Sequence, residues 1–243
     1  MHKEKSQIIN PKSQIFLIPT LLHEDALHVL PSYILEAVKQ CNVFFVENER
    51  SARRYLKQLD KQIVIDNYEW FTIGKAEADV RQQFREKIKQ RKTIGVISEA
   101  GCPCVADPGQ LLVSVAQELN ADVVPLVGPS SILLALMASG MNGQQFAFAG
   151  YLPIDNHKRI KTIKELEAES KKKNCTQIFI ETPYRNNQLL DSLLKTCQSH
   201  TKICIAASIT GPDECIKTKT VSQWKKEPVD LHKKPAIFLL HSA

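Results

Sequence analysis

Short apolar runs alternate with amphipathic segments through the first half of the chain. Runs such as residues 13–20, 42–47 and 93–98 are apolar on both faces, which is typical of strands inside a parallel sheet. Between the runs, apolar residues recur at helical spacing among charged ones. The pattern predicts the order β-α-β-α-β-α-β-α-β, with residues 63–68 as the third strand, and a mostly parallel sheet covered on both faces.

The second half contains more strand-like runs for each helix than the first half. An apolar run at 146–150 precedes a lysine-rich helical segment, and further runs follow at 177–181, 202–208, 215–221 and 236–241. This composition predicts a mixed sheet with antiparallel pairs. The composition changes at the lysine-rich segment 154–174, and we place the boundary before it, in the turn around residues 126–130. We therefore expect two α/β domains, residues 1–127 and 128–243, each with a sheet flanked by helices.

Two turns rich in small residues and proline follow the apolar strands on either side of residues 110–119. Gly101 and Gly109 allow the first turn to approach a ligand closely, and Ser130 and Ser131 in the second turn can cap the next helix. Because parallel strands joined by a helix end at the same edge, both turns should border the crevice where α/β proteins bind ligands. Two ordinary strand-to-helix turns would show the same features, so these residues alone leave both readings open.

Composition is that of an ordinary globular protein. Apolar residues make up 43% of the 243 positions and charged residues 24%, and the N-terminus shows neither a long apolar run nor a secretory leader pattern. We therefore expect a cytoplasmic protein that does not enter a membrane. The net charge of +6 arises in residues 126–243, which hold 16 basic and 10 acidic side chains against 16 and 16 in residues 1–125. Such asymmetry fits a polyanionic partner or a solvated lysine-rich face.

Several kinds of chemistry lack their motifs in this sequence. The chain has no G-x-G-x-x-G or G-x-x-x-x-G-K-[ST] loop, no H-E-x-x-H and no G-x-S-x-G elbow. Its seven cysteines are odd in number and scattered, and Cys102 and Cys104 lack partners at zinc-ligand spacing, so we expect no metal. The remaining crevice suits a reaction in which a bound cofactor supplies reactivity and the protein supplies position.

Three segments taken together carry a family resemblance. They are SEAGCPCVADPG, VVPLVGPSSILLALMASG and FAFAGYLP, and the match continues in IFLIPT, VENER, IFIETPYR and AIFLL, so it spans almost the whole chain. In this order the segments resemble the tetrapyrrole methylase superfamily. They are most similar to its branch that methylates the ribose 2′-hydroxyl of a cytidine in small-subunit ribosomal RNA.

The resemblance implies a fold, a cofactor and an assembly. It implies two α/β domains with S-adenosylmethionine in the cleft between them, and homodimers as the usual assembly. Carried over by position, it implies cofactor contacts from Pro19, Ala100, Gly101, Cys102, Val105, Ser130, Ser131, Glu181 and Ala236. A sulfonium methyl group is already activated, so a general base is needed only for a weakly acidic hydroxyl. The candidate carboxylates for that role are Glu47, Glu49, Glu99 and Asp107.

The resemblance implies that the acceptor is RNA and that the protein takes part in ribosomal RNA processing. Arg50 is available to hold a phosphate, and Lys158, Arg159 and Lys161 of the lysine-rich helix are expected to contact further phosphates. Two segments depart from the RNA branch. Its P-T-P-x-G-N-L becomes PTLLHEDAL after the first strand, and its A-R-E-L-T-K becomes residues 206–211, AASITG. A small-molecule or protein acceptor, or a binding protein without turnover, therefore remains an alternative.

Overall fold

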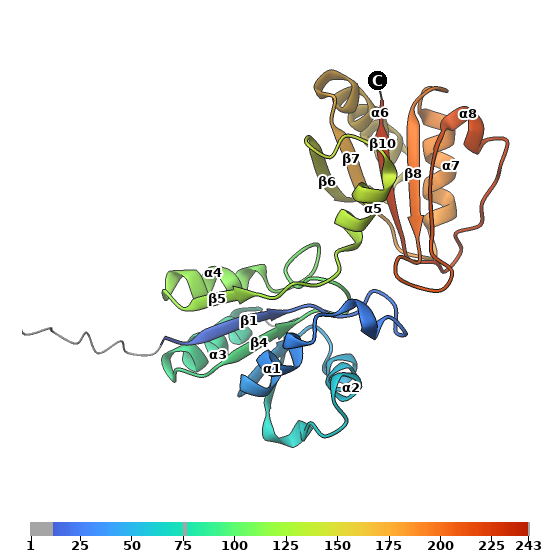
Figure 1. Cartoon of the computed structure of the whole chain (residues 1–243). Coiled ribbons are helices and arrows are strands. Elements are labelled where there is room, and N and C mark those ends of the chain that lie inside the picture. The colour runs from blue at the N-terminus through green and yellow to red at the C-terminus, as the bar shows by residue number, and fades with distance from the viewer. Residues whose placement is uncertain (1–11, 75–76, 243) are drawn as a thin grey trace, which may run out of the picture. The chain divides into compact units, whose positions relative to one another are not determined.

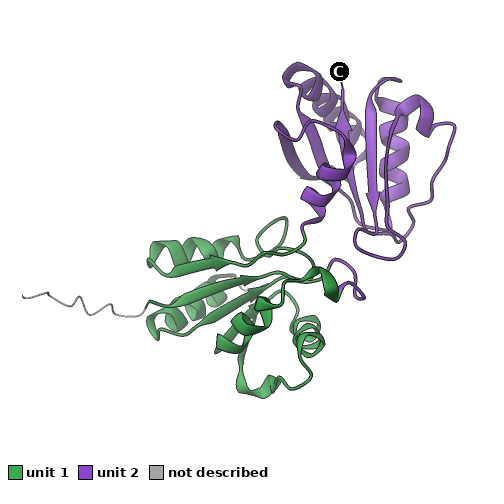
Figure 2. Ribbon diagram, viewed as in Figure 1, with its two compact units in different colours: residues 1–21, 27–129 green, residues 22–26, 130–243 purple. Residues whose placement is uncertain are grey.

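The structure is a computed structural model that describes residues 12–74 and 77–242. The chain divides into two compact units, shown in Figure 2. Unit 1 contains the residues up to Leu21 and Leu27–Pro129, and unit 2 contains Leu22–Ala26 and the residues from Ser130 onward. The chain passes from unit 1 to unit 2 between Pro129 and Ser130, and the domain boundary after residue 127 stays a prediction. The sequence pattern gives no sign that Leu22–Ala26 packs with unit 2.

In the described part of unit 1, five strands form one parallel sheet (Figure 1). The strand order is β3-β2-β4-β1-β5, and the chain alternates strands and helices as the apolar pattern predicts. The strands are β1 Gln14–Ile18, β2 Val43–Val46, β3 Glu69–Thr72, β4 Ile94–Ile97 and β5 Asp122–Pro125. The helices are η1 Leu27–Val29, α1 Tyr33–Gln40, α2 Glu49–Leu59, η2 Ile65–Asn67, α3 Glu77–Lys89 and α4 Gln110–Glu118.

Both faces of this sheet are buried. On β1, Phe16 belongs to a cluster with residues of α1 and α2, whereas its neighbour Ile15 belongs to a second cluster with residues of α3 and α4. Phe44 and Phe45 of β2 divide between the two clusters in the same way. Successive side chains of a strand point to opposite faces, so a strand covered on both sides must be apolar at every position. This explains the continuous apolar runs in the sequence.

The third strand lies later in the chain than the sequence predicts. The apolar pattern predicts a strand at residues 63–68, but Ile65–Asn67 form the 3-10 turn η2, in which the Tyr68 N–H donates to the Ile65 carbonyl at 3.3 Å. The strand is instead Glu69–Thr72, whose Trp70 and Phe71 stack on Phe44 and Phe45 at centroid distances of 5.0 and 4.8 Å. Aromatic pairs across strands stabilise a pairing, and here they favour the later segment.

Between residues 130 and 242, five strands form the mixed sheet of unit 2, in the order β6-β7-β10-β8-β9. β6 and β7 pair in parallel and the remaining neighbours pair antiparallel, which confirms the predicted mixture. The strands are β6 Phe146–Tyr151, β7 Thr176–Ile180, β8 Lys202–Ala207, β9 Cys215–Thr220 and β10 Ala236–His241. The helices are α5 Ser131–Ser139, α6 Asn156–Lys173, α7 Asn186–Thr196 and α8 Val221–Trp224.

The core of unit 2 also has two parts. One cluster joins α6, α7 and α8 to the sheet and contains Phe179 and Phe238, whose rings stack 6.1 Å apart. The other lies where α5 packs on β8 and β10, around Ile132 and Leu239. None of the helices within the described residues combines the length and hydrophobicity that crossing a bilayer requires.

The packing of β4 generates a stability prediction at Gly95. A Cβ atom there would lie 2.5 Å from Cε1 of Phe44 and 2.9 Å from Cδ1 of Ile18, both fully buried. We expect Gly95→Ala to lower the free energy of unfolding by about 1–3 kcal/mol, because these side chains must leave their positions. Urea unfolding measures the change. The matched control is Gly143→Ala, where a Cβ meets nothing within 4 Å. Equal stability of the two variants would contradict the packing described.

Candidate functional site

The carboxyl ends of the central strands in unit 1 converge because those strands are parallel. Pro19 and Thr20 follow β1, Glu47 follows β2, and the turn that contains Gly101 follows β4. The Thr20 N–H donates to the Gly101 carbonyl at 2.8 Å, and the Glu47 N–H donates to the Ile97 carbonyl at 3.1 Å. The Tyr55 hydroxyl of α2 donates to the Pro19 carbonyl at 2.7 Å. These bonds hold the three strand ends together at one edge of the sheet.

The turn after β4 is conformationally unusual. Left-handed φ angles occur at Gly101 (70°), Cys104 (69°), Ala106 (64°) and Gly109 (123°). Glycine adopts such angles readily, but for Cys104 and Ala106 they are unfavourable and persist only when the surrounding structure imposes them. Strained backbone of this kind is concentrated at ligand sites. The turn is therefore shaped for something other than connecting β4 to α4.

The turn after β5 packs against the same edge of unit 1. A side chain at residue 128 would overlap the ring of Pro19, so glycine is needed there for close approach. The Cys102 thiol donates to the carbonyl oxygens of Gly128 and Pro129, at 3.7 and 3.5 Å. Among the predicted cofactor contacts of unit 1, Pro19, Gly101 and Cys102 thus lie together, and Ala100 and Val105 are exposed in the same turn.

The thiols in this turn are not activated. Burial raises the pKa of Cys102, and burial together with the charge of Asp107 raises the pKa of Cys104 to about 11. Both side chains are therefore neutral thiols near pH 7, which are poor nucleophiles and poor metal ligands. Across the described residues, no three His, Cys, Asp or Glu side chains form a group that could hold a metal ion.

Three of the four candidate carboxylates gather at this edge. The Glu47 Oε2 accepts the Glu99 N–H at 3.1 Å, and the Ser51 hydroxyl donates to Glu99 Oε1 at 3.2 Å. Asp107 is half-buried, and its pKa is raised to about 6, first by burial and then by the charge of Glu47, with Glu99 adding a smaller effect against a Ser98 hydrogen bond. A carboxyl group that titrates near neutrality can accept or release a proton under physiological conditions.

The fourth candidate, Glu49, lies elsewhere. It occupies the first turn of α2, where its carboxylate pairs with Arg53 one helical turn later. Asn48 caps the same helix, because its side chain accepts the N–H groups of Arg50 and Ser51 at 3.0 and 3.3 Å. Arg50 itself is exposed at the start of α2.

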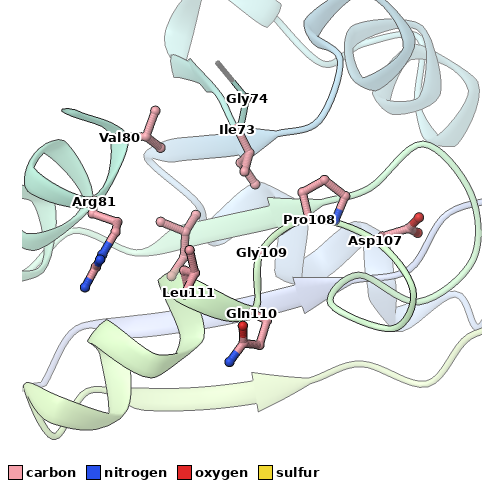
Figure 3. Close-up of a pocket in the computed structure, with 10 residues that line it drawn as sticks. Ile73, Gly74, Val80, Arg81, Asp107, Pro108, Gly109, Gln110 and Leu111 are labelled. Atoms are coloured by element: carbon pink, nitrogen blue, oxygen red, sulfur yellow. The ribbon is translucent and has the colours of Figure 1, made fainter. Parts of the chain in front are cut away.

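A cavity of about 260 Å³ borders the strained turn of unit 1 (Figure 3). Its walls are mainly apolar, with Val80 and Leu111 opposite Pro108, and Arg81 supplies a cation. Figure 3 shows the Asp107 carboxylate directed away from Val80 and Leu111. The charges of Glu47 and Glu99 act on this carboxylate, and Asp107, which also lines the cavity, connects the two features.

The four predicted cofactor contacts of unit 2 occur at one end of its sheet and at the start of α5. Ser130 caps α5, with its hydroxyl accepting the Leu133 N–H at 3.5 Å, and Ser131 is the first helical residue. Ile180 pairs with Ile237, so Glu181 after β7 and Ala236 at the start of β10 lie at the same end. Buried Glu181 accepts the Arg185 Nε and Nη2 hydrogens on Oε1, at 3.0 and 2.6 Å.

The expected basic face of α6 needs one correction. Lys158 and Lys161 are exposed, but Arg159 is 2% exposed and points into unit 2. Its guanidinium donates to Ser192 Oγ at 3.0 Å, to the Ile154 carbonyl at 2.8 Å and to Asn156 Oδ1 at 3.0 Å. A buried guanidinium with these partners is a structural group, because exposing it to a phosphate would leave them unpaired. Arg159 therefore does not belong to an exposed RNA-binding face.

Most of the chain matches one protein family. Residues 33–224 match the family described as Tetrapyrrole (Corrin/Porphyrin) Methylases. The chain belongs to this family. Membership confirms the resemblance of the sequence segments, and it makes the protein a methyltransferase that uses S-adenosylmethionine.

Two relatives cover nearly all of this tetrapyrrole methylase family member. The chain is 27% identical over 237 residues to ribosomal RNA small subunit methyltransferase I of Buchnera aphidicola subsp. Schizaphis graminum, with 96% of this chain and 79% of that protein covered. It is 25% identical over 242 residues to the protein of the same name from Escherichia coli O157:H7, with coverage of 98% and 81%.

Solved structures show the same fold. A diphthine synthase matches with a TM-score of 0.67 and 13% identity, over 94% of this chain and 89% of that one. A uroporphyrin-III C-methyl transferase from Thermus thermophilus, complexed with S-adenyl homocysteine, matches with a TM-score of 0.53 and 15% identity, over 95% and 98%. These matches confirm the predicted fold class.

Several residues that shape the site are not among the predicted site residues. Tyr55 holds the Pro19 carbonyl, Ser51 and Ser98 bond to the carboxylates, and Arg185 neutralises Glu181. Ser98 and Arg185 fall within the segments SEAGCPCVADPG and IFIETPYR, whereas Ser51 and Tyr55 of α2 have no sequence signal.

The raised pKa of Asp107 predicts a stability effect that depends on pH. The folded state holds the proton more tightly than the unfolded state, so the carboxyl contributes stability below about pH 4 that is lost as pH rises through about 6. We expect Asp107→Asn to raise the melting temperature at pH 8 and to leave it nearly unchanged at pH 4. Thermal unfolding at both pH values measures this. Exposed Asp66→Asn serves as the control, and a gain at pH 4 equal to that at pH 8 would contradict the assignment.

Proposed function

We propose that the enzyme transfers the methyl group of S-adenosylmethionine to a ribose 2′-hydroxyl of small-subunit ribosomal RNA. The observation that carries the proposal is the similarity to ribosomal RNA small subunit methyltransferases along 96–98% of this chain. A cytoplasmic location and a homodimeric assembly, which the resemblance implies, form part of the same proposal.

The proposed cofactor contacts fit the chemistry of S-adenosylmethionine. In unit 1, the left-handed Gly101 and small neighbours such as Ala100 allow backbone groups to approach a ligand. In unit 2, the N-terminus of α5 at Ser130 and Ser131 suits a carboxylate, and Glu181, whose charge Arg185 already balances, suits a hydroxyl group. The remaining proposed contacts are Pro19, Cys102, Val105 and Ala236. When bound, the cofactor supplies an activated methyl group, so the protein chiefly has to position it.

Asp107 is the proposed general base. A ribose hydroxyl is a weak acid, so its attack on a methyl group is faster when a positioned base accepts the proton. With a pKa of about 6, Asp107 is mainly ionised at neutral pH and basic enough to accept a proton. Glu47 and Glu99 are proposed to support that role, since their charges help to raise the pKa. Glu49, paired with Arg53, is assigned a structural role.

A transfer assay tests the proposed function directly. The enzyme is mixed with S-adenosylmethionine labelled at the methyl group and with unmodified small-subunit ribosomal RNA, both free and assembled into small subunits. We expect label in RNA, at a nucleotide whose 3′ linkage resists alkali because its 2′-oxygen is methylated. Label recovered in protein or in a small molecule instead would overturn the RNA assignment.

Asp107→Asn tests the base. We expect kcat to fall by about 10²–10⁴-fold with an unchanged Kd for S-adenosylmethionine, because the base acts only on the acceptor. The wild-type kcat should rise with pH through about 6 and then level off. Glu86→Gln, an exposed change on α3, is the control and should retain activity. An Asp107→Asn enzyme with wild-type kcat would exclude this role.

The exposed lysines of α6 generate a prediction about RNA affinity. We expect Lys158→Glu with Lys161→Glu to raise the KM for RNA and to lower the slope of log affinity against log salt by about 0.7–0.9 for each phosphate that is no longer neutralised. Arg159 is left in place, because its change would disturb the interior. The control is Lys195→Glu with Lys202→Glu, which changes the net charge equally on α7 and β8. Equal slopes for both variants would show that α6 is not a specific RNA-binding element.

A further inference from the structure

The segment Leu22–Ala26 packs on the turn that follows β8. Leu22 packs against the cluster that contains Ile209, and the His23 ring lies against Gly211. A Cβ atom at residue 211 would lie 2.7 Å from Cδ2 of His23 and 3.0 Å from its Cγ. Either a side chain at 211 or the imidazole can occupy this space, but not both. His23 and Gly211 lie in the two segments, PTLLHEDAL and AASITG, in which the sequence departs from the RNA branch. The two departures are therefore coupled by packing.

The His23 imidazole is held in a defined orientation. Its Nδ1 accepts the Asp25 N–H at 3.3 Å, and the Ala26 N–H donates to the His23 carbonyl at 3.0 Å. Nδ1 also lies 3.8 Å from the Asp25 carboxylate, and Nε2 carries a proton both in the neutral ring whose Nδ1 accepts this bond and in the protonated ring. Within residues 12–74 and 77–242, Nε2 has no hydrogen-bond partner, and the side chain is 30% exposed. The ring therefore presents a free donor to a ligand.

The turn beneath His23 is strained. Ser208 and Thr210 have left-handed φ angles of 52° and 67°, which a β-branched residue such as Thr210 rarely adopts. The Thr210 hydroxyl is buried without a hydrogen-bond partner in the described chain, although its N–H donates to Glu214 at 2.7 Å. Strain and an unsatisfied hydroxyl both lower stability. The turn therefore carries a cost in stability that its packing with Leu22 and His23 must offset.

The turn also lies at the relevant end of the sheet in unit 2. Ala207 pairs with Ala236, and the Ser208 N–H donates to the Pro235 carbonyl at 2.9 Å. His23 is therefore fixed to the end of the sheet that carries Ala236, a proposed cofactor contact. A donor at this end is well placed to contact the molecule that receives the methyl group.

We propose that His23, seated on Gly211, binds the RNA acceptor through its Nε2–H and so helps to hold it in position. The partner it fits is a hydrogen-bond-accepting oxygen of the acceptor's phosphate or ribose. Gly211 is the positioning residue, because its lack of a side chain keeps the ring in place. The inference rests on the proposed function, which it extends to the acceptor side of the site in unit 2.

A cycle of substitutions tests the coupling. His23→Ala should raise the KM for small-subunit ribosomal RNA by about 10-fold or more, the effect of losing one hydrogen bond to a charged or polar group, with kcat and the Kd for S-adenosylmethionine unchanged. Gly211→Ala should raise KM similarly, because the new methyl group displaces the ring. The backbone at 211 is not left-handed, but the new Cβ would also lie 3.1 Å from the Ser208 carbonyl oxygen, so the melting temperature of each Gly211→Ala variant is compared with that of its parent. The double variant should be no worse than His23→Ala alone.

Controls separate this inference from the function on which it rests. His200→Ala removes an exposed imidazole beyond the opposite end of β8 and should leave KM unchanged. Melting temperatures identify any variant that fails through folding. A His23→Ala enzyme with wild-type KM, or one whose defect lies in the Kd for S-adenosylmethionine, overturns the inference and leaves the function standing. If Gly211→Ala also raises KM in the His23→Ala background, the ring is not the affected group. If the wild type labels no RNA, both proposals fail.

Discussion

Parallel pairing of the strands of unit 1 is the constraint on which the rest of that unit depends. Because β1, β2 and β4 run in the same direction, the residues that follow them must leave from one edge. Backbone bonds such as that from Thr20 to Gly101 then connect turns far apart in sequence. Reversing one strand would send Glu47 or Gly101 to the opposite edge, so the arrangement depends on strand direction before it depends on any side chain.

The three carboxylates at this edge, Glu47, Glu99 and Asp107, illustrate a conflict between stability and chemistry. Three acidic side chains in a partly buried region repel one another, and the shifted titration of Asp107 records that repulsion and its burial. A sequence selected for stability alone would place a neutral residue there. The strained φ angles of Cys104 and Ala106 act in the same direction. The apolar clusters on both faces of the sheet supply the stability that offsets these costs.

The sequence predicts strands and helices where the apolar pattern is strong and fails where tertiary contacts decide. Runs that are apolar on both faces identify β1, β2 and β4. The third strand forms at Glu69–Thr72 and not at residues 63–68, because Trp70 and Phe71 stack on β2. Arg159 sits in a lysine-rich segment and reads as exposed, yet Ser192 and Asn156 bind its guanidinium inside unit 2. Motifs can locate Asp107, whereas its titration depends on Glu47, about sixty positions earlier, and on burial, which no local pattern records.

Because Leu22–Ala26 belongs to unit 2, part of unit 2 is synthesised before most of unit 1. A ribosome makes these five residues before almost all of unit 1, and their packing partners Ile209 and Gly211 only near the end of the chain. The segment therefore cannot make these packing contacts until the turn after β8 has been translated. A fragment that starts at Ser130 would contain every strand of unit 2, yet would leave the face of Gly211 bare. Unit 2 is thus a structural entity without being a contiguous gene segment.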